Sequence, residues 1–112
     1  MKLIEIIIPH RELEDVRQIL KELNTGGMSH YTVEGSGRIK AERVTVRFGT
    51  SQTQPKYIPR TKVEVVVKDH QVEELISKIT DKLGSELGGK IFVIDVQVAV
   101  DIQTKKRGED AI

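Results

Sequence analysis

Apolar and polar positions follow two different periods near the start of the chain. Residues 3–8 are mostly β-branched and apolar and are followed by Pro9, which is typical of a short strand. Over residues 13–23, apolar side chains recur every three or four positions with charged side chains between them, and this period predicts an amphipathic helix. Residues 24–27 (Asn-Thr-Gly-Gly) then supply glycines that commonly end a helix. The pattern therefore predicts a strand followed by a helix.

The same pattern returns 59 positions further along the chain. Residues 63–67 match residues 4–8 type for type, and residues 72–79 repeat the apolar and acidic positions of residues 13–20. A repeat at a fixed offset indicates an internal duplication of one strand–helix unit.

Each unit is followed by a further predicted strand, over residues 29–34 and 91–102. Asp69 is the expected N-cap of the second helix. Two βαβ halves predict an α+β fold, a ferredoxin-like βαββαβ sandwich, within a single domain of residues 1–112.

The last predicted strand is apolar on both of its faces. We expect six of its side chains to face the helices, namely Phe92, Ile94, Val96, Val98, Val100 and Ile102. Ile91 and Val93 are then on the opposite face, which two helices cannot also cover. A second copy of the chain is the simplest cover, so we predict a homo-oligomer. The alternative is a monomer with scattered exposed apolar side chains.

Residues 38–60 interrupt the pattern between the second and third predicted strands. A hairpin connection needs only two to five residues, so we interpret this insertion as a functional loop. It carries six basic residues and a single acidic one, and this charge suits an anionic ligand or partner. A solvated loop without a partner is the alternative. The basic residues are Arg38, Lys40, Arg43, Arg47, Lys56 and Arg60.

Composition excludes several classes of protein. The chain has 112 residues and a net charge of +1, with 38% hydrophobic and 31% charged residues, which is ordinary for a globular domain. Without cysteine it has no disulfide, thiolate zinc site or cysteine nucleophile. His10, His30 and His70 lack metal-ligand spacing, so we expect no metal site and no catalytic residues.

No apolar run approaches the length of a membrane span, and Glu5 interrupts the apolar start, so we expect a cytoplasmic protein.

Two glycine motifs are candidates for phosphate binding. Residues 35–38 read Gly-Ser-Gly-Arg and residues 88–90 read Gly-Gly-Lys, and in both a cation follows glycines whose backbone N–H groups can approach an anion. A role in turns alone is the alternative for each. Nucleic acid is a less suitable ligand, because the predicted central strands carry Ile and Val where RNA-binding sheets carry stacking aromatics.

Several motifs together resemble the PII signal-transduction proteins. They are Lys2-x-Ile4-Glu5-x-Ile7-Ile8, Leu13-Glu14-Asp15-Val16-Arg17, Gly27-Met28-Ser29, Gly35-x-Gly37-Arg38-x-Lys40, Pro59-Arg60-x-Lys62-x-Glu64, Gly89-Lys90-Ile91-Phe92-Val93 and Gly108-Glu109-Asp110-Ala111-Ile112. The resemblance runs from end to end apart from the loop. It implies a ferredoxin-like homotrimer without enzymatic activity that binds ATP or ADP in three clefts between subunits. It further implies sensing of 2-oxoglutarate with Mg-ATP and a long loop that docks on transporters, enzymes or regulators of nitrogen metabolism.

The resemblance also implies individual binding residues. Met28 and Ser29 would approach the adenine, with Ile7 and Glu64 on neighbouring walls of the cleft. The residues around the ribose and phosphates would be Gly35, Gly37, Arg38, Gly88, Gly89 and Lys90. The partner-binding loop would use Arg43, Arg47, Lys56, Tyr57 and Arg60.

Three of the positions that depart from the PII pattern bear on the choice of ligand. Ile39 replaces a glutamine that contacts 2-oxoglutarate and the metal shell, and its apolar side chain argues against 2-oxoglutarate and magnesium as effectors. Asp101 and Gln103 replace arginines that bind phosphates, and the carboxylate of Asp101 would repel a triphosphate. We therefore expect an adenine nucleotide, with ADP, AMP or a cyclic nucleotide preferred over ATP. The alternative is a vestigial nucleotide site in a trimer that responds to another anion, such as bicarbonate, or to an acidic partner.

Overall fold

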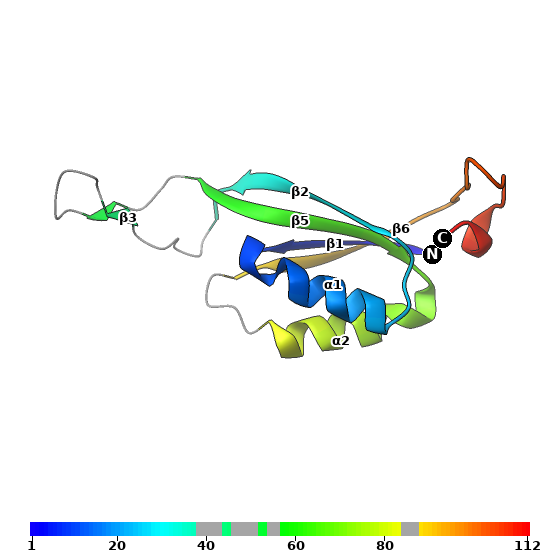
Figure 1. Cartoon of the computed structure of the whole chain (residues 1–112), viewed down its shortest axis with the longest axis horizontal. Coiled ribbons are helices and arrows are strands. Elements are labelled where there is room, and N and C mark those ends of the chain that lie inside the picture. Colours follow the sequence, from blue (N-terminus) through cyan, green and yellow to red (C-terminus); the bar gives the residue numbers. More distant parts are fainter. Residues whose placement is uncertain (38–43, 46–51, 54–56, 84–87) are drawn as a thin grey trace.

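The protein consists of one four-stranded sheet with two helices on one of its faces (Figure 1). The structure, a computed structural model, describes residues 1–37, 44–45, 52–53, 57–83 and 88–112. No helix in these ranges is long and apolar enough to cross a membrane. In chain order the elements are β1 (Lys2–Ile8), the 3-10 turn η1 (His10–Glu12), α1 (Leu13–Glu22), β2 (Met28–Gly35), β3 (Val44–Thr45), β4 (Gln52–Thr53), β5 (Ile58–Val67), the 3-10 turn η2 (Asp69–Gln71), α2 (Val72–Lys82), β6 (Lys90–Asp95) and the 3-10 turn η3 (Gly108–Ala111).

The strand order confirms the predicted ferredoxin-like sandwich. The sheet runs β2-β5-β1-β6, and every neighbouring pair is antiparallel. The first strands of the two duplicated units, β1 and β5, lie side by side at the centre, and β2 and β6 form the edges. Both helices lie on the same side of the sheet, so neither covers the other side, hereafter the open face (Figure 1).

The core forms where the strand and helix periods meet. Alternate residues of β1 and β5 point toward the helices and are almost completely buried: Ile4, Ile6, Ile8, Val63, Val65 and Val67. They pack against one side of each helix, with Val16 and Leu20 from α1 and Leu75 and Ile79 from α2. These six residues share one face of the sheet, since successive strand residues alternate between faces.

The predicted last strand is too long. Instead of extending to residue 102, β6 ends at Asp95, which lies opposite Lys2. The next backbone N–H, that of Val96, donates to the Met1 carbonyl at 3.2 Å. The chain then folds back on itself, and the Gly108 N–H donates to the Ala99 carbonyl at 2.9 Å.

The assignment of the faces of β6 is also wrong. Ile91 lies opposite Ile6 and packs against the core, because paired residues on neighbouring strands share a face. Phe92 and Ile94 consequently lie on the open face, with 44% and 43% of their surfaces exposed. The open face is therefore even more apolar than expected.

The long loop is shorter at its C-terminal end than the predicted range of residues 38–60. Residues 58–60 belong to β5, because β2 continues to Gly35 and provides their pairing partners. Within the loop, β3 and β4 pair in antiparallel fashion. The remaining described loop residue, Tyr57, is exposed, whereas Arg38, Arg43, Arg47 and Lys56 lie outside the described residues.

The prediction that Asp69 caps α2 is wrong. Its carboxylate instead binds the ammonium group of Met1. Its Oδ1 accepts a hydrogen bond of 2.8 Å from the ammonium group of Met1. The turn η2 separates it from the helix, and Gln71 instead caps that turn by accepting from the Lys68 N–H at 3.0 Å. This ion pair connects the first residue of β1 to the segment that follows β5.

We expect the pair to make stability depend on pH in the acidic range. The ammonium group of Met1 lowers the pKa of Asp69, so the stabilisation is present above the pKa of the unfolded chain and is lost as the pH falls through the lower, folded value. Asp69→Asn should lower the urea midpoint at pH 7, and its difference from wild type should shrink below about pH 4. Asp81→Asn on α2 is the control. A difference that stays constant across this range would contradict the assignment.

Candidate functional site

The open face carries two rows of side chains that cross all four strands. Register places them in order from β2 to β6. One row consists of Ser29, Glu64, Glu5 and Phe92, and the next of Tyr31, Lys62, Ile7 and Lys90. Four predicted nucleotide-binding side chains therefore share this face, those of Ser29, Glu64, Ile7 and Lys90.

A network of charged and polar groups connects the two rows. Lys62 Nζ lies 3.3 Å from Glu5 Oε2, and the Tyr31 hydroxyl donates to Glu64 Oε1 at 2.9 Å. Lys62 Nζ also lies 5.8 Å from the centre of the Tyr31 ring, a cation–π distance. The Tyr31 phenol, followed by the Glu5 carboxylate, raises the pKa of Lys62, so this lysine keeps its charge.

This network offsets the repulsion between two carboxylates that lie directly opposite each other on neighbouring strands. Glu5 and Glu64 face each other across β1 and β5, where like charges repel. Each has a separate partner, Lys62 for Glu5 and Tyr31 for Glu64. The sequence analysis missed the roles of Tyr31 and Lys62, although their alternation with Ser29 and Glu64 along β2 and β5 places all four on one face.

The predicted binding residues form two pairs on neighbouring strands. Ser29 on the edge strand β2 lies opposite Glu64 on β5, and Lys90 on the edge strand β6 lies opposite Ile7 on β1. The two edge strands are three strand spacings, about 14 Å, apart. Ser29 and Lys90 therefore lie at opposite edges of the open face, and Glu64 and Ile7 lie between them.

Met28 does not join Ser29 on the open face. It lies opposite Val65, and its side chain packs against the core on the helix side. Strand alternation gives this result, because neighbouring residues in β2 point to opposite faces.

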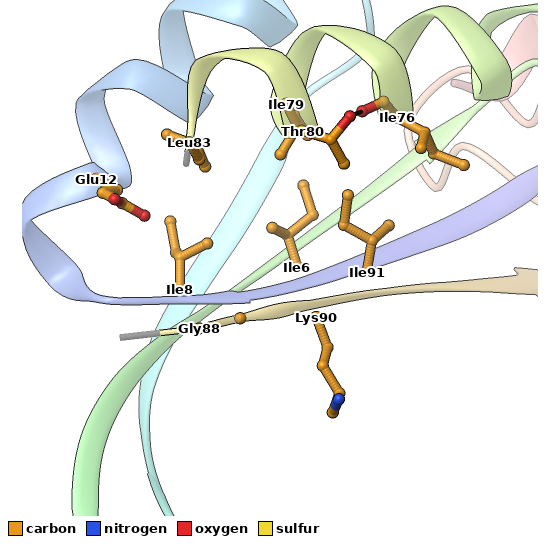
Figure 2. Close-up of a pocket in the computed structure, with 11 residues that line it drawn as sticks. Ile6, Ile8, Glu12, Ile76, Ile79, Thr80, Leu83, Gly88, Lys90 and Ile91 are labelled. Atoms are coloured by element: carbon orange, nitrogen blue, oxygen red, sulfur yellow. Dashed lines mark hydrogen bonds between the residues drawn. The ribbon is translucent and has the colours of Figure 1, made fainter. Parts of the chain in front are cut away.

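The second glycine motif has a backbone that suits only glycine. Gly88 and Gly89 have φ values of 78° and 153°. A Cβ on Gly89 would lie 2.7 Å from the carbonyl oxygen of Ile7, so β6 approaches β1 here more closely than a side chain permits. This approach puts Lys90 at the first position of the strand, pointing to the open face (Figure 2).

The first glycine motif is less constrained. Gly35 ends β2 and Gly37 follows it, and a Cβ on either would meet nothing within 4 Å. Arg38 and Ile39 lie outside the described residues. Arg60, at the other side of the loop base, lies in β5 opposite Val33.

Asp101 has a structural role that the sequence analysis missed. Its Oδ1 accepts a hydrogen bond of 2.7 Å from the Thr104 N–H, which closes a turn. These backbone hydrogen bonds lower the pKa of Asp101, so its carboxylate remains ionised. Aspartate at the first position of a turn is the local signal for such a hydrogen bond. Gln103 lies within the same turn.

Metal chemistry has no obvious location on the described part of the chain. There, no group of three or more His, Asp or Glu side chains is arranged to hold an ion. His10 instead lies with Nδ1 2.8 Å from the hydroxyl of Thr61, a buried residue of β5. The chemistry of the candidate site therefore rests on backbone N–H groups and on the Lys62, Lys90, Glu5 and Glu64 charges.

Comparison with known proteins gives a consistent result. The model of the family described as nitrogen regulatory protein P-II matches residues 1–106. The nitrogen regulatory protein P-II of Pasteurella multocida is 39% identical and that of Haemophilus influenzae 38% identical, both over 114 aligned residues. The nitrogen regulatory protein GlnK of Escherichia coli K12 is 32% identical over 117. Each alignment covers all of this chain and all of the relative.

Proposed function

Because this chain belongs to the nitrogen regulatory protein P-II family, we propose that it binds an adenine nucleotide in the clefts between the subunits of a homotrimer. The ligand is ATP, ADP, AMP or a cyclic nucleotide, and its occupancy sets the state of the loop between β2 and β5. The loop in turn controls a regulated protein, such as a transporter, an enzyme or a regulator of nitrogen or carbon metabolism. The protein acts by binding, in the cytoplasm, and not by catalysis.

The division of the candidate site between two edges of the sheet is the observation that carries this proposal. Ser29 and Lys90 lie on opposite edge strands about 14 Å apart, so one chain alone does not enclose a ligand between them. When one copy's β6 edge meets another copy's β2 edge, the two groups line one cleft. The cleft then offers polar groups for a base and a cation for phosphate.

The apolar part of the open face supports assembly. Phe92 and Ile94 are exposed large side chains that lie next to each other on this face of β6. Contiguous exposed apolar side chains are typical of protein–protein contacts. Three copies that turn their open faces toward a common axis would bury these side chains together.

Asp101 favours a second candidate function. A carboxylate whose pKa is held low remains charged at neutral pH and repels phosphates that approach it. If this repulsion prevents nucleotide binding, the trimer responds to another anion, such as bicarbonate, or to an acidic partner that its basic loop attracts. Nucleic acid is the less suitable polyanion, because no row of stacking aromatics crosses the described strands.

Titration calorimetry distinguishes the two functions. We expect ATP, ADP, AMP or cyclic AMP to bind at one site per chain, with guanine nucleotides as the control for base recognition. The titrations are repeated with magnesium, 2-oxoglutarate and bicarbonate. No heat from any nucleotide at millimolar concentration would refute the first function, and saturable heat from bicarbonate alone would then support the second.

Asp101→Asn tests the role of this charge without breaking its turn. An asparagine retains the Oδ1 acceptor for the Thr104 N–H but removes the negative charge. We expect ATP to bind about tenfold more tightly, which corresponds to a repulsion of about 1.4 kcal/mol. Asp81→Asn, which removes a charge from α2 on the helix side, should leave the affinity unchanged. Equal affinity in Asp101→Asn and wild type would show that Asp101 does not face the phosphates.

A further inference from the structure

A cavity of about 360 Å³ lies between α2, the start of α1 and the sheet (Figure 2). Aliphatic side chains form most of its wall, namely those of Ile6, Ile8, Ile76, Ile79, Leu83 and Ile91. The cavity is on the helix side of the sheet. It therefore opens on the other side of the sheet from the nucleotide site proposed above, although the backbone of Gly88, Gly89 and Lys90 borders both.

One carboxylate points into this apolar space. Glu12 lies where η1 meets α1, and Figure 2 shows its carboxyl group directed toward the cavity. Its Oε2 is buried and, in the part of the chain that the structure describes, accepts no hydrogen bond. A buried carboxylate oxygen without a donor is costly, because it has lost its water without replacement.

The polar neighbours of the cavity do not compensate this oxygen. The Thr80 hydroxyl at the rim donates to the Ile76 carbonyl at 2.9 Å. Lys90, although its backbone lines the cavity, directs its ammonium group to the other side of the sheet (Figure 2). The site thus combines apolar walls with one unsatisfied anionic acceptor.

We propose that the cavity binds a small organic cation, a primary ammonium group on a short alkyl or aryl body. The ammonium group donates to Glu12 Oε2, and the apolar body contacts the isoleucines. The volume is near the lower limit for small-molecule sites, so it suits a compact ligand. A carboxylate ligand is excluded by repulsion from Glu12, and a neutral alcohol lacks the charge that strengthens the hydrogen bond.

A matched series of probes tests this preference. The five isoleucines of the wall give methyl NMR signals that report on occupancy, and Ile4 and Ile19, which do not line the cavity, serve as internal controls. We expect hexylammonium to shift the five wall signals and to bind about tenfold more tightly than hexanol. Hexanoate should not bind. Equal affinity for all three probes, or no shifts with any of them, would overturn the proposal.

Variants then assign the preference to Glu12. Glu12→Gln should reduce the affinity for hexylammonium to that for hexanol. Glu14→Gln removes the same charge from the exposed side of α1, where Glu14 pairs with Arg17 at 2.8 Å, and should change nothing. Ile76→Phe should fill the space and abolish binding of every probe while the Ile4 and Ile19 signals persist. Unchanged hexylammonium affinity in Glu12→Gln, or binding that survives in a folded Ile76→Phe, would refute the site.

Discussion

Replacing Gly89 by alanine should lower the free energy of unfolding by roughly 2–5 kcal/mol. The φ value of 153° belongs to a region that residues with a Cβ avoid. The added Cβ would also lie 2.7 Å from the carbonyl oxygen of Ile7, a backbone atom that cannot turn aside as a side chain does. Relief requires β6 to move away from β1 where Ile7 and Lys90 are paired. Urea unfolding followed by circular dichroism measures the loss.

Gly27→Ala is the matched control for this variant. A Cβ on Gly27 meets nothing within 4 Å, so the substitution should change stability by less than about 1 kcal/mol. Because the shift of β6 also displaces Lys90, Gly89→Ala should weaken nucleotide binding even at temperatures where it remains folded. Wild-type stability and affinity in Gly89→Ala would show that the close approach of β6 to β1 is not needed.

Replacing Ile94 by aspartate should prevent assembly of the proposed trimer and leave a monomer. Ile94 is 43% exposed on the open face, the face proposed to meet other subunits, and assembly would bury its replacement as an unpaired carboxylate. Such a charge costs several kcal/mol at each interface, so the variant should remain monomeric at micromolar concentration. Light scattering should give 12.6 kDa for the variant and three times this mass for wild type.

Val93→Asp provides a closely matched control. Val93 is the preceding residue of the same strand and is 42% exposed, but it lies on the helix side of the sheet. The Val93→Asp substitution should therefore leave the mass of the assembly the same as in wild type. Monomers in both variants would indicate a general loss of structure, and a trimer in both would place the interface elsewhere.

The Ile94→Asp monomer also connects assembly to nucleotide binding. Its β2 and β6 edges remain intact, but the two groups of candidate binding residues no longer meet. We expect no nucleotide heat from this variant under conditions in which Val93→Asp binds normally. A folded monomer that binds ADP as well as wild type does would contradict a cleft between subunits.

The local periods of the sequence determined the elements and most of the core. The β-branched runs at residues 4–8 and 63–67 identified the strands β1 and β5, and the alternation of faces along them placed Ile4, Ile6 and Ile8 on one side together. The duplication predicted the order of the elements, and with it the sandwich. The motifs identified the family, since they combine residues from the whole chain.

Only the tertiary structure decided the features that depend on pairing between distant segments, such as which face of β6 meets the helices. β6 is apolar on both faces, so its own sequence does not indicate which face meets the helices; the position of Ile91 opposite Ile6 does. Asp69 carries a signal for a helix cap, yet the Met1 ammonium group competes for its carboxylate. The division of the binding residues between two edges and the orientation of Glu12 into an apolar cavity likewise follow from register and packing. These contacts join residues far apart in the chain, and no local pattern encodes their geometry.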